Sequence, residues 1–181
     1  MEQKNDFSTI MTGRRSVRVY DETYKIPHEE MLEMIKEATT APSSVNMQPW
    51  RFVVAESEEA KEILRPLIRF NTRQNDTSSA MVMIFGDMQC YEYGEEIYNQ
   101  AYESGKMPKE VRDQQLAAII PYYKSFSREE MNDVVKVDSS LAAMQFMLVA
   151  RDHGYETNPI GGFEADQLAE AFGLDKDRYV P

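Results

Sequence analysis

The sequence of 181 residues contains little histidine or cysteine, with two histidines and a single cysteine, Cys90. One cysteine excludes a disulfide framework, a zinc finger and a CxxC redox pair within one chain. Two histidines without an HExxH spacing would leave a zinc site dependent on carboxylates. We interpret His28 and His153, at the start and the end of expected helices, as structural. The GxSxG, GxGxxG and GxxxxGK[ST] motifs are also missing, so no obvious hydrolase, dinucleotide or P-loop signature is present.

Basic residues are fewer than acidic ones, and long apolar runs are missing. The chain has 20 Lys and Arg against 31 Asp and Glu, a formal net charge of −11. This acidity disfavours nucleic acid or an anionic membrane as the main partner, because both would repel it. No run of 18 apolar residues is present, and the N-terminal segment lacks the apolar core of a secretory signal. We therefore expect a cytoplasmic protein with no nucleic-acid or membrane partner.

The apolar patterning contains more helical than strand-like segments. At about 150 residues per domain, the length predicts one domain over residues 1–181. Strands are expected at Arg51–Ala55, at Met81–Phe85 and, more briefly, near 155–157. Because these strands do not alternate strictly with helices, the predicted fold class is α+β or a mixed three-layer arrangement. Helices are expected over 7–13, 28–40, 56–68, 138–151 and 164–172, with two or three more in a peripheral excursion over about 91–131 that Gly105, Pro108 and Pro121 interrupt.

Three arginines lie within five residues after the first expected helix: Arg14, Arg15 and Arg18. Guanidinium groups offer forked donors that suit phosphate oxygens. Two or three of them roughly balance a phosphate monoester, which carries about −1.5 to −2 charges at neutral pH. Ser16 adds a hydroxyl donor. Taken alone, however, such a cluster is more often a solvated basic turn that pairs with nearby acids.

The segment APSSVNMQPW, residues 41–50, joins an expected helix to an expected strand. Pro42 and Pro49 stiffen it, because the residue before each proline is pushed toward extended conformations. Polar side chains projecting from such a track would suit a flat heterocycle with a polar rim. A helix-to-strand connection with hydroxyl caps and a buried Trp50 is at least as common.

The turn NPIGGF, residues 158–163, contains the adjacent glycines Gly161 and Gly162. Glycines let a backbone approach a ligand closely and point N–H groups at it, although an ordinary turn before a helix uses them too. Side chains for acid–base or nucleophilic chemistry are otherwise scarce, and Cys90 has no basic neighbour. If the protein is an enzyme, we expect a cofactor to perform the chemistry.

The segments RRSVRVYD, APSSVNMQPWRFVV and NPIGGF, in this order and at these separations, resemble the FMN-dependent nitroreductase family, and the similarity extends from Phe7 to Tyr179. The resemblance implies a three-layer α+β fold with a mixed central sheet flanked by helices. It also implies an intertwined homodimer that binds FMN at its interface, where we expect the helix Asp138–Arg151. Members of the family pass electrons from NADH or NADPH to nitroaromatics, quinones or similar flat acceptors. A further strand and tail beyond the position of Pro181, reaching the partner subunit, are implied as well.

The resemblance assigns the phosphate end and the rim of the flavin to particular residues. Arg14, Arg15 and Ser16 match phosphate contacts. Arg18 matches a basic residue near the pyrimidine edge of the ring, where it would favour the negative charge that the ring gains. The loop that lines the ring and the ribityl chain across the dimer is matched by Pro42, Ser43, Ser44, Asn46 and Gln48.

The remaining assignments concern the ring edge and the substrate. Asn71 matches a hydrogen-bonding position at the ring edge, and Gln74 stands where some relatives have a basic residue. Gly161 and Gly162 match the turn whose backbone N–H faces flavin N5, and Tyr123 matches an aromatic lid over the substrate. No catalytic side chain is implied, because flavin N5 accepts the hydride, and alternating use of one ring face implies ping-pong kinetics. Two alternatives remain open: a reductive dehalogenase or flavin-modifying enzyme of the same fold, and a non-catalytic flavin-binding module.

Overall fold

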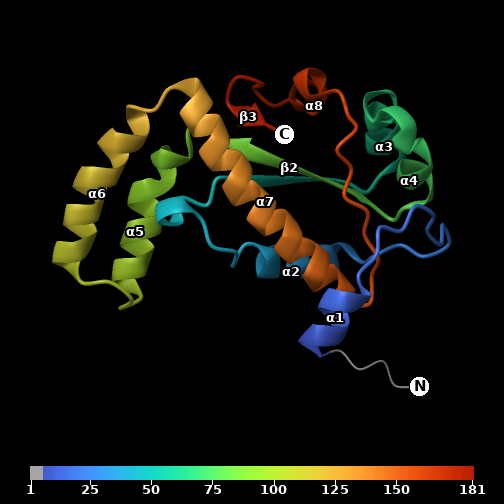
Figure 1. Cartoon of the computed structure of the whole chain (residues 1–181), viewed down its shortest axis with the longest axis horizontal. Helices are drawn as coiled ribbons and strands as arrows, with labels where there is room; N and C mark the ends of the chain where they lie inside the picture. Colours follow the sequence, from blue (N-terminus) through green and yellow to red (C-terminus); the bar gives the residue numbers. More distant parts are fainter. Residues whose placement is uncertain (1–5) are drawn as a thin grey trace.

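The computed structural model describes residues 6–181 (Figure 1). Its strands are β1 (Trp50–Ala55), β2 (Met81–Asp87) and β3 (Tyr179–Val180). Its helices are α1 (Phe7–Gly13), α2 (His28–Ala38), α3 (Glu58–Leu64), α4 (Thr72–Thr77), α5 (Gly94–Glu103), α6 (Lys109–Lys124), α7 (Arg128–Asp152) and α8 (Ala165–Ala171). Short 3-10 turns are η1 (Ser44–Asn46), η2 (Arg65–Leu67), η3 (Arg69–Asn71) and η4 (Cys90–Tyr93).

The sheet has the strand order β1-β2-β3, and both pairings are antiparallel. The mixed sheet implied by the resemblance is therefore not found within residues 6–181. Parallel pairing is limited to an isolated bridge between Ser16 and Thr157. The strand expected near 155–157 forms only this bridge. No longer stretch of the described residues lies alongside Thr157 to pair with it.

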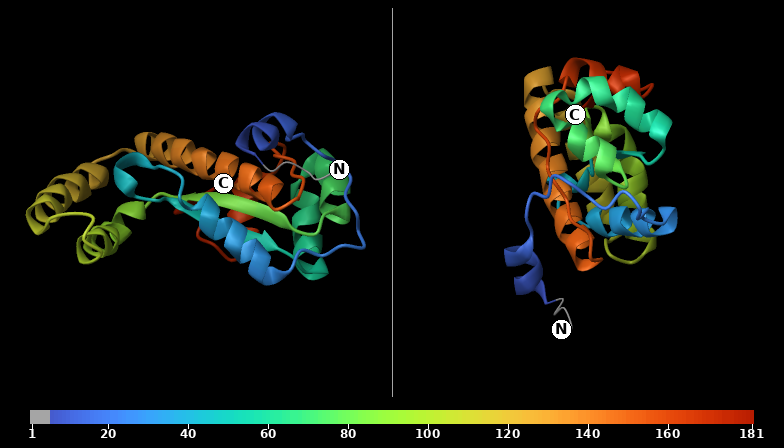
Figure 2. Two further views of the ribbon diagram at one scale, coloured as in Figure 1. Left: turned by 90° about the horizontal axis from the view of Figure 1, so that it is seen from below. Right: turned by 90° about the vertical axis from the view of Figure 1, so that its right-hand side faces the viewer.

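Side chains of β1 and β2 alternate between two faces, which produces three layers. Phe52 and Val82 pack against α2 and α7 on one face, in a cluster that includes Met34 and Phe146. On the other face, the neighbours of these residues in the strands pack against α3 and α8, in a cluster that includes Phe85. The right-hand view of Figure 2 shows α7 on one side of the molecule and α3 with α8 on the other. The expected α+β three-layer fold is thus confirmed.

Helix α7 is the longest element and extends ten residues N-terminally of the expected start at Asp138. Its first turn is fixed by a capping box, in which the Ser127 hydroxyl accepts from the Glu130 N–H and the Glu130 carboxylate accepts from the Ser127 N–H. Buried side chains face the sheet and α2. On the opposite side, Val137, Leu141 and Met144 form an exposed stripe with helical spacing, hereafter the α7 stripe.

The expected peripheral excursion forms a pair of helices, α5 and α6, that projects beyond the N-terminal end of α7 (Figure 1). Gly105, with φ of 71°, lies between the two helices as expected. Pro121 does not interrupt the second one, since α6 continues through it to Lys124. The pair has its own core cluster with the start of α7, which includes Tyr98, Tyr123 and Met131. Among the helices of residues 6–181, none is long and apolar enough to cross a membrane.

Candidate functional site

The arginine motif lies on an extended segment that follows α1 and is fixed at two points. The N–H of Val17 donates to the Thr157 carbonyl over 3.1 Å, and the N–H of Tyr20 donates to the Thr77 hydroxyl over 3.2 Å. Ser16 and Arg18, on either side of Val17, are exposed. The segment therefore presents Ser16 and Arg18 to the outside, next to the segment that leads into Gly161.

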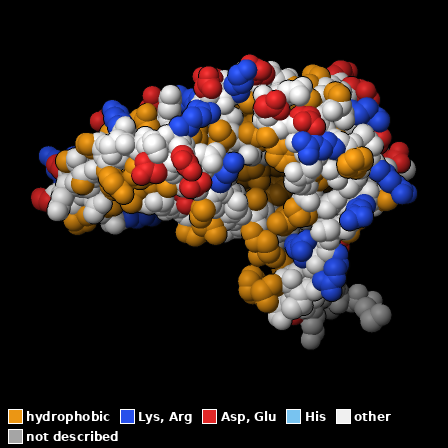
Figure 3. Space-filling view, turned by 45° about the horizontal axis from the view of Figure 1, so that its top comes forward, with side chains coloured by type: hydrophobic (Ala, Val, Ile, Leu, Met, Phe, Trp, Pro, Cys, Tyr) orange, Lys and Arg blue, Asp and Glu red, His pale blue; other side chains and the backbone are white. Residues whose placement is uncertain are grey.

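The arginines of this segment have no acidic partner among the described residues, although the chain is strongly acidic. Arg15 donates only to the carbonyls of Thr12 and Arg14. Nη1 of Arg14 is buried and has no hydrogen-bond partner within residues 6–181. Figure 3 shows Lys and Arg side chains gathered along the arm that ends at the N-terminus. A buried unpaired guanidinium nitrogen is costly, so this arm suits an anionic ligand.

The glycine turn and Asn71 come together beside this arm. Asn71 Nδ2 donates to the Gly162 carbonyl over 3.2 Å, and a Cβ at Gly162 would lie 3.3 Å from that nitrogen. The N–H groups of Gly161 and Gly162 donate to no other described residue, and nothing lies near the position of a Cβ at Gly161. The two N–H groups are thus without a partner among residues 6–181, while the Asn71 side chain holds the turn.

An ion pair between Arg69 and Glu164, which the sequence did not predict, holds the turn η3 against the glycine turn. Arg69, with φ of 50°, donates from Nε to Glu164 Oε1 over 2.8 Å and from Nη2 to Oε2 over 3.3 Å. These hydrogen bonds lower the pKa of Glu164. The next residue, Phe70, is 98% exposed and was not predicted as a site residue. The one feature of the sequence that could have indicated it is its position directly before Asn71. We call Arg14, Arg15, Ser16, Arg18, Asn71, Gly161 and Gly162 the N-terminal half-site.

The proline-braced segment forms a tight loop around η1. Val45, Asn46 and Gln48 have φ values of 43°, 58° and 46°, which non-glycine residues adopt at a cost of about 1–3 kcal/mol each. Inside the loop, the Ser43 hydroxyl accepts from the Gln48 N–H, and Asn46 Oδ1 accepts from Gln48 Nε2. Trp50 is buried, as the structural interpretation of this segment expected. We call the predicted residues of the loop the loop half-site: Pro42, Ser43, Ser44, Asn46 and Gln48.

Tyr123 is not the exposed lid that the resemblance implied. Its side chain is 2% exposed, lies in the core of the α5–α6 pair, and donates its hydroxyl to the Ser44 carbonyl over 3.3 Å. Burial raises the pKa of this phenol, so it stays a donor. The lid assignment was wrong because Tyr123 follows buried Ile119 by four residues and shares its inward face. Its neighbour Tyr122 carries the exposed ring.

The two half-sites lie beside different parts of α7. The Ser44 N–H of the loop half-site donates to Asp138 Oδ2 over 3.0 Å, near the middle of the helix. Near the C-terminal end of the helix, a Cβ at Gly13, which directly precedes Arg14, would lie 3.5 Å from the Arg151 side chain. Thirteen residues of helix separate Asp138 from Arg151, about 20 Å along the axis. The structure brings the residues of each half-site together but keeps the two half-sites apart within one chain.

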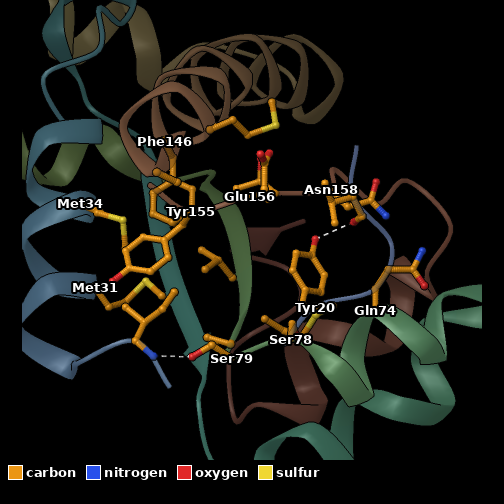
Figure 4. Close-up of a pocket in the computed structure, with 18 of the residues that line it drawn as sticks. Tyr20, Met31, Met34, Gln74, Ser78, Ser79, Phe146, Tyr155, Glu156 and Asn158 are labelled. Atoms are coloured by element: carbon orange, nitrogen blue, oxygen red, sulfur yellow. Dashed lines mark hydrogen bonds between the residues drawn. The ribbon is translucent and has the colours of Figure 1, made fainter. Parts of the chain in front are cut away.

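A cavity of about 780 Å³ lies behind the N-terminal half-site (Figure 4). Its lining is mostly apolar, with Met31 and Met34 of α2 on one side and Phe146 of α7 above. Val17 and Val19 contribute the inward side of the arginine segment, and Gln74 reaches it beside Asn158. No arginine or glycine of the half-site lines the cavity. We therefore place the candidate site on the outer surface and not in this cavity.

Other reactive groups do not add to the site. Burial raises the pKa of the Cys90 thiol to about 12, which keeps it protonated and agrees with the expectation that it is no nucleophile. The two histidines pair with carboxylates away from the half-sites, His28 with Glu56 and His153 with Glu30. Within residues 6–181, no group of three His, Cys, Asp or Glu side chains is arranged to hold a metal ion.

Comparison with known proteins gives matches over nearly the whole chain. The chain is 53% identical to the Bacillus subtilis (strain 168) protein YdgI, which is assigned as an NAD(P)H nitroreductase. The match extends over 181 residues, 100% of this chain and 87% of the relative. The CLA biosynthesis enone reductase of Lactiplantibacillus plantarum is 39% identical over 178 residues, 98% of this chain and 82% of the relative.

Solved structures agree with these sequence matches. A protein of Exiguobacterium sibiricum 255-15, assigned as a nitroreductase and crystallised in complex with FMN, has a TM-score of 0.94 and 56% identity over 97% of this chain and 84% of its own. A family model described as the nitroreductase family matches residues 11–180. With this match and relatives above half identity, the chain belongs to the nitroreductase family.

Proposed function

We propose that the protein is an FMN-dependent oxidoreductase that passes electrons from NADH or NADPH to nitroaromatics, quinones or similar flat acceptors. The observation that carries the proposal is the set of arginines that have no acidic partner in the described part of the chain, one of them with a buried unpaired nitrogen, in a chain of net charge −11. A phosphate group would supply the missing acceptors. The FMN complex of the Exiguobacterium relative supports the choice of ligand. Because the electron donors NADH and NADPH are found in the cytoplasm, we propose that the enzyme acts there.

The residues of the N-terminal half-site suit both ends of FMN, the phosphate and the flavin ring. Arg14, Arg15 and Ser16 would bind the phosphate, and Arg18 would lie at the pyrimidine edge. The free N–H groups of Gly161 and Gly162 offer donors to the reacting side of the ring. Asn71 holds that turn in place through the Gly162 carbonyl and would contact the ring edge itself.

We propose that a second copy of the chain completes the site. The residues of α7 that lie beside the two half-sites, Asp138 and Arg151, are about 20 Å apart along the helix, which disfavours a ring held by both half-sites of one chain. The α7 stripe supplies an apolar surface between them, as expected of a homodimer interface. Ser43, Ser44 and Asn46 of one copy would then line the ring and ribityl chain held by the other.

Bound FMN supplies hydride and electron transfer that no side chain of this chain can perform. The chain's own part is to bind and orient. The Arg18 guanidinium would stabilise negative charge at the pyrimidine edge, and the glycine N–H groups would orient the reacting edge. Phe70, exposed next to Asn71, would provide an apolar wall for the acceptor. We propose that donor and acceptor occupy the same space in turn, which gives ping-pong kinetics.

A second candidate reaction is the reduction of an activated carbon–carbon double bond. It is favoured by the 39% identity to an enone reductase, which also has a solved structure with a TM-score of 0.89. Reductive dehalogenation, flavin modification and non-catalytic flavin binding remain the other readings of the same site.

The test is an anaerobic titration of the purified, FMN-loaded protein with NADPH and with NADH, followed in the visible spectrum. We expect the flavin absorbance to be lost on adding the donor and to return on adding an acceptor. A panel of a nitroaromatic, a quinone, an enone and a halogenated phenol then separates the candidate reactions. A protein that gains no FMN on titration would refute the proposal, and FMN that neither donor bleaches would indicate a binding module.

A further inference from the structure

The loop half-site keeps a conformation that its own residues disfavour. Val45, Asn46 and Gln48 all have φ between 43° and 58°, and none is a glycine. Such a conformation persists only where surrounding contacts enforce it. The hydrogen bonds within the loop are short-range, so they do not fix its place relative to the rest of the molecule.

Three side chains from three different helices fix that place. Tyr98 of α5 donates its hydroxyl to the Val45 carbonyl over 3.0 Å. Tyr123 of α6 donates to the Ser44 carbonyl over 3.3 Å. Asp138 of α7 accepts the Ser44 N–H over 3.0 Å. The two backbone carbonyls and one N–H at the tip of the loop are thereby bonded from behind.

All three side chains are buried, which makes their polar groups costly unless they are used. Tyr98 is 6% exposed and Asp138 is 4% exposed. No Lys, Arg or His of the described residues lies within ion-pairing distance of Asp138, so the Ser44 N–H is its hydrogen-bond partner. A carboxylate kept in such a position without a cation lowers stability. The hydrogen bond from the Ser44 N–H offsets part of this cost and ties the carboxylate to the loop.

We propose that Tyr98, Tyr123 and Asp138 are positioning residues that hold the loop half-site in the conformation that receives the flavin ring of a second copy. This inference rests on the proposed function. It assigns the α5–α6 pair a role as a rear support for the loop. The loop's exposed side, with Ser44 and Asn46, stays free for the ligand because its backbone is bonded from the buried side.

The test compares two double variants of the full-length protein. Tyr98→Phe with Tyr123→Phe removes both hydroxyls that reach the loop and keeps both rings. Tyr102→Phe with Tyr122→Phe is the matched control, since it removes two exposed hydroxyls from the same two helices. We expect the first variant to weaken FMN binding at least tenfold, measured by quenching of flavin fluorescence. We expect its circular dichroism in the flavin bands at saturating FMN to differ from wild type, and the control to match wild type in both.

A second pair of variants examines the carboxylate. Asp138→Asn keeps an oxygen that accepts the Ser44 N–H and should retain FMN affinity, whereas Asp138→Leu removes the acceptor and should lose it. If the tyrosine double variant fails to fold, the single variants and this pair give the same comparison. Wild-type protein that does not bind FMN would refute the proposed function itself. Wild-type binding with equal affinities in both tyrosine double variants, or in Asp138→Asn and Asp138→Leu alike, would overturn this inference alone.

Discussion

The surroundings of Arg14 favour a role in ligand binding over a purely structural role. Most arginines elsewhere in the chain pair with carboxylates, such as Arg51 and Arg178 with Asp87. Arg14 instead keeps a buried nitrogen that has no partner among the residues the structure describes. An unpaired buried donor lowers the stability of the free protein, and it gains a partner when an anion binds. Affinity and stability should therefore respond differently when Arg14 is removed.

Replacing Arg14 with alanine should weaken FMN binding tenfold to a hundredfold, because hydrogen bonds to charged groups are worth about 1.5–3 kcal/mol. The same change should leave the free energy of unfolding of the FMN-free protein unchanged or slightly higher. Titration of flavin fluorescence and urea unfolding measure the two quantities. Arg128→Ala, which removes an exposed arginine outside both half-sites, is the control. Equal FMN affinities of the two variants would remove Arg14 from the phosphate site.

Asp138 gives a prediction about pH with a definite sign. Burial raises its pKa, while the Ser44 N–H opposes the shift. The folded state therefore holds this proton more tightly than the unfolded state does, and the contribution of Asp138 to stability falls as pH rises from about 4 through its raised pKa. In Asp138→Asn this fall is removed. Urea unfolding between pH 4 and pH 8 should show the variant gaining stability over wild type as pH rises, and a constant difference would contradict the shift.

Some residue placements could be read from the sequence and others could not. The spacing of Ile119 and Tyr123 already indicated a shared buried face, so the lid assignment to Tyr123 was avoidable. The three left-handed residues of the loop could not be foreseen, because only Asn46 among them readily adopts that conformation. The contact between Asn71 and Gly162 joins positions 91 residues apart and depends on the fold alone.

At the scale of elements, the α7 stripe makes a prediction about assembly. Leu141→Asp places a charge in the middle of the stripe, and we expect a homodimer to become monomeric and to lose FMN. Size-exclusion chromatography with light scattering measures the first effect, and the visible spectrum measures the second. Ile63→Asp on α3 is the control, since Ile63 is exposed to a similar degree, 47% against 43%. An FMN-loaded dimer of Leu141→Asp would show that the stripe is not the interface.

The end of the sheet depends on one buried carboxylate. Asp87 is fully buried and accepts from Arg51 of β1 over 2.8 Å and from Arg178, just before β3, over 2.9 Å. Asp87→Ala should lower the free energy of unfolding by about 3–5 kcal/mol, because it leaves two guanidinium groups without their partner. Glu92→Ala, which removes an exposed partner of Arg178, should cost about 1 kcal/mol or less. Urea unfolding that gives equal losses would contradict this role of Asp87.

The sequence predicted helix and strand boundaries best where apolar residues are concentrated. The run from Met81 predicted β2, and the most apolar part of α7 predicted that helix from Asp138 onward. The first ten residues of α7, in which charged and apolar residues are mixed, were not assigned to this helix, although Ser127 and Glu130 carry the capping-box spacing that marks a helix start. Helix α4 was missed because its six residues are too few to show a period.

For the whole molecule, the main consequence of the fold is the separation of the two half-sites. The loop half-site lies beside the middle of α7 and the N-terminal half-site beside its C-terminal end, so proximity in one chain does not explain how they act together. The resemblance predicted a site shared across a dimer, and the separation of about 20 Å within one chain supports that prediction. Oligomeric state, the single-domain assignment and the residues that contact FMN stay predictions.

The most direct measurement of this claim is the FMN content of a mixed dimer. One chain would carry Arg14→Ala with Arg18→Ala, the other Ser44→Glu with Asn46→Glu, each with its own affinity tag. Both variants should form dimers, and neither homodimer should bind FMN. In the mixed dimer one site joins the two intact half-sites, so we predict one FMN per dimer that NADPH bleaches. A mixed dimer as empty as its parents would show that each chain builds its site alone, and would contradict the account.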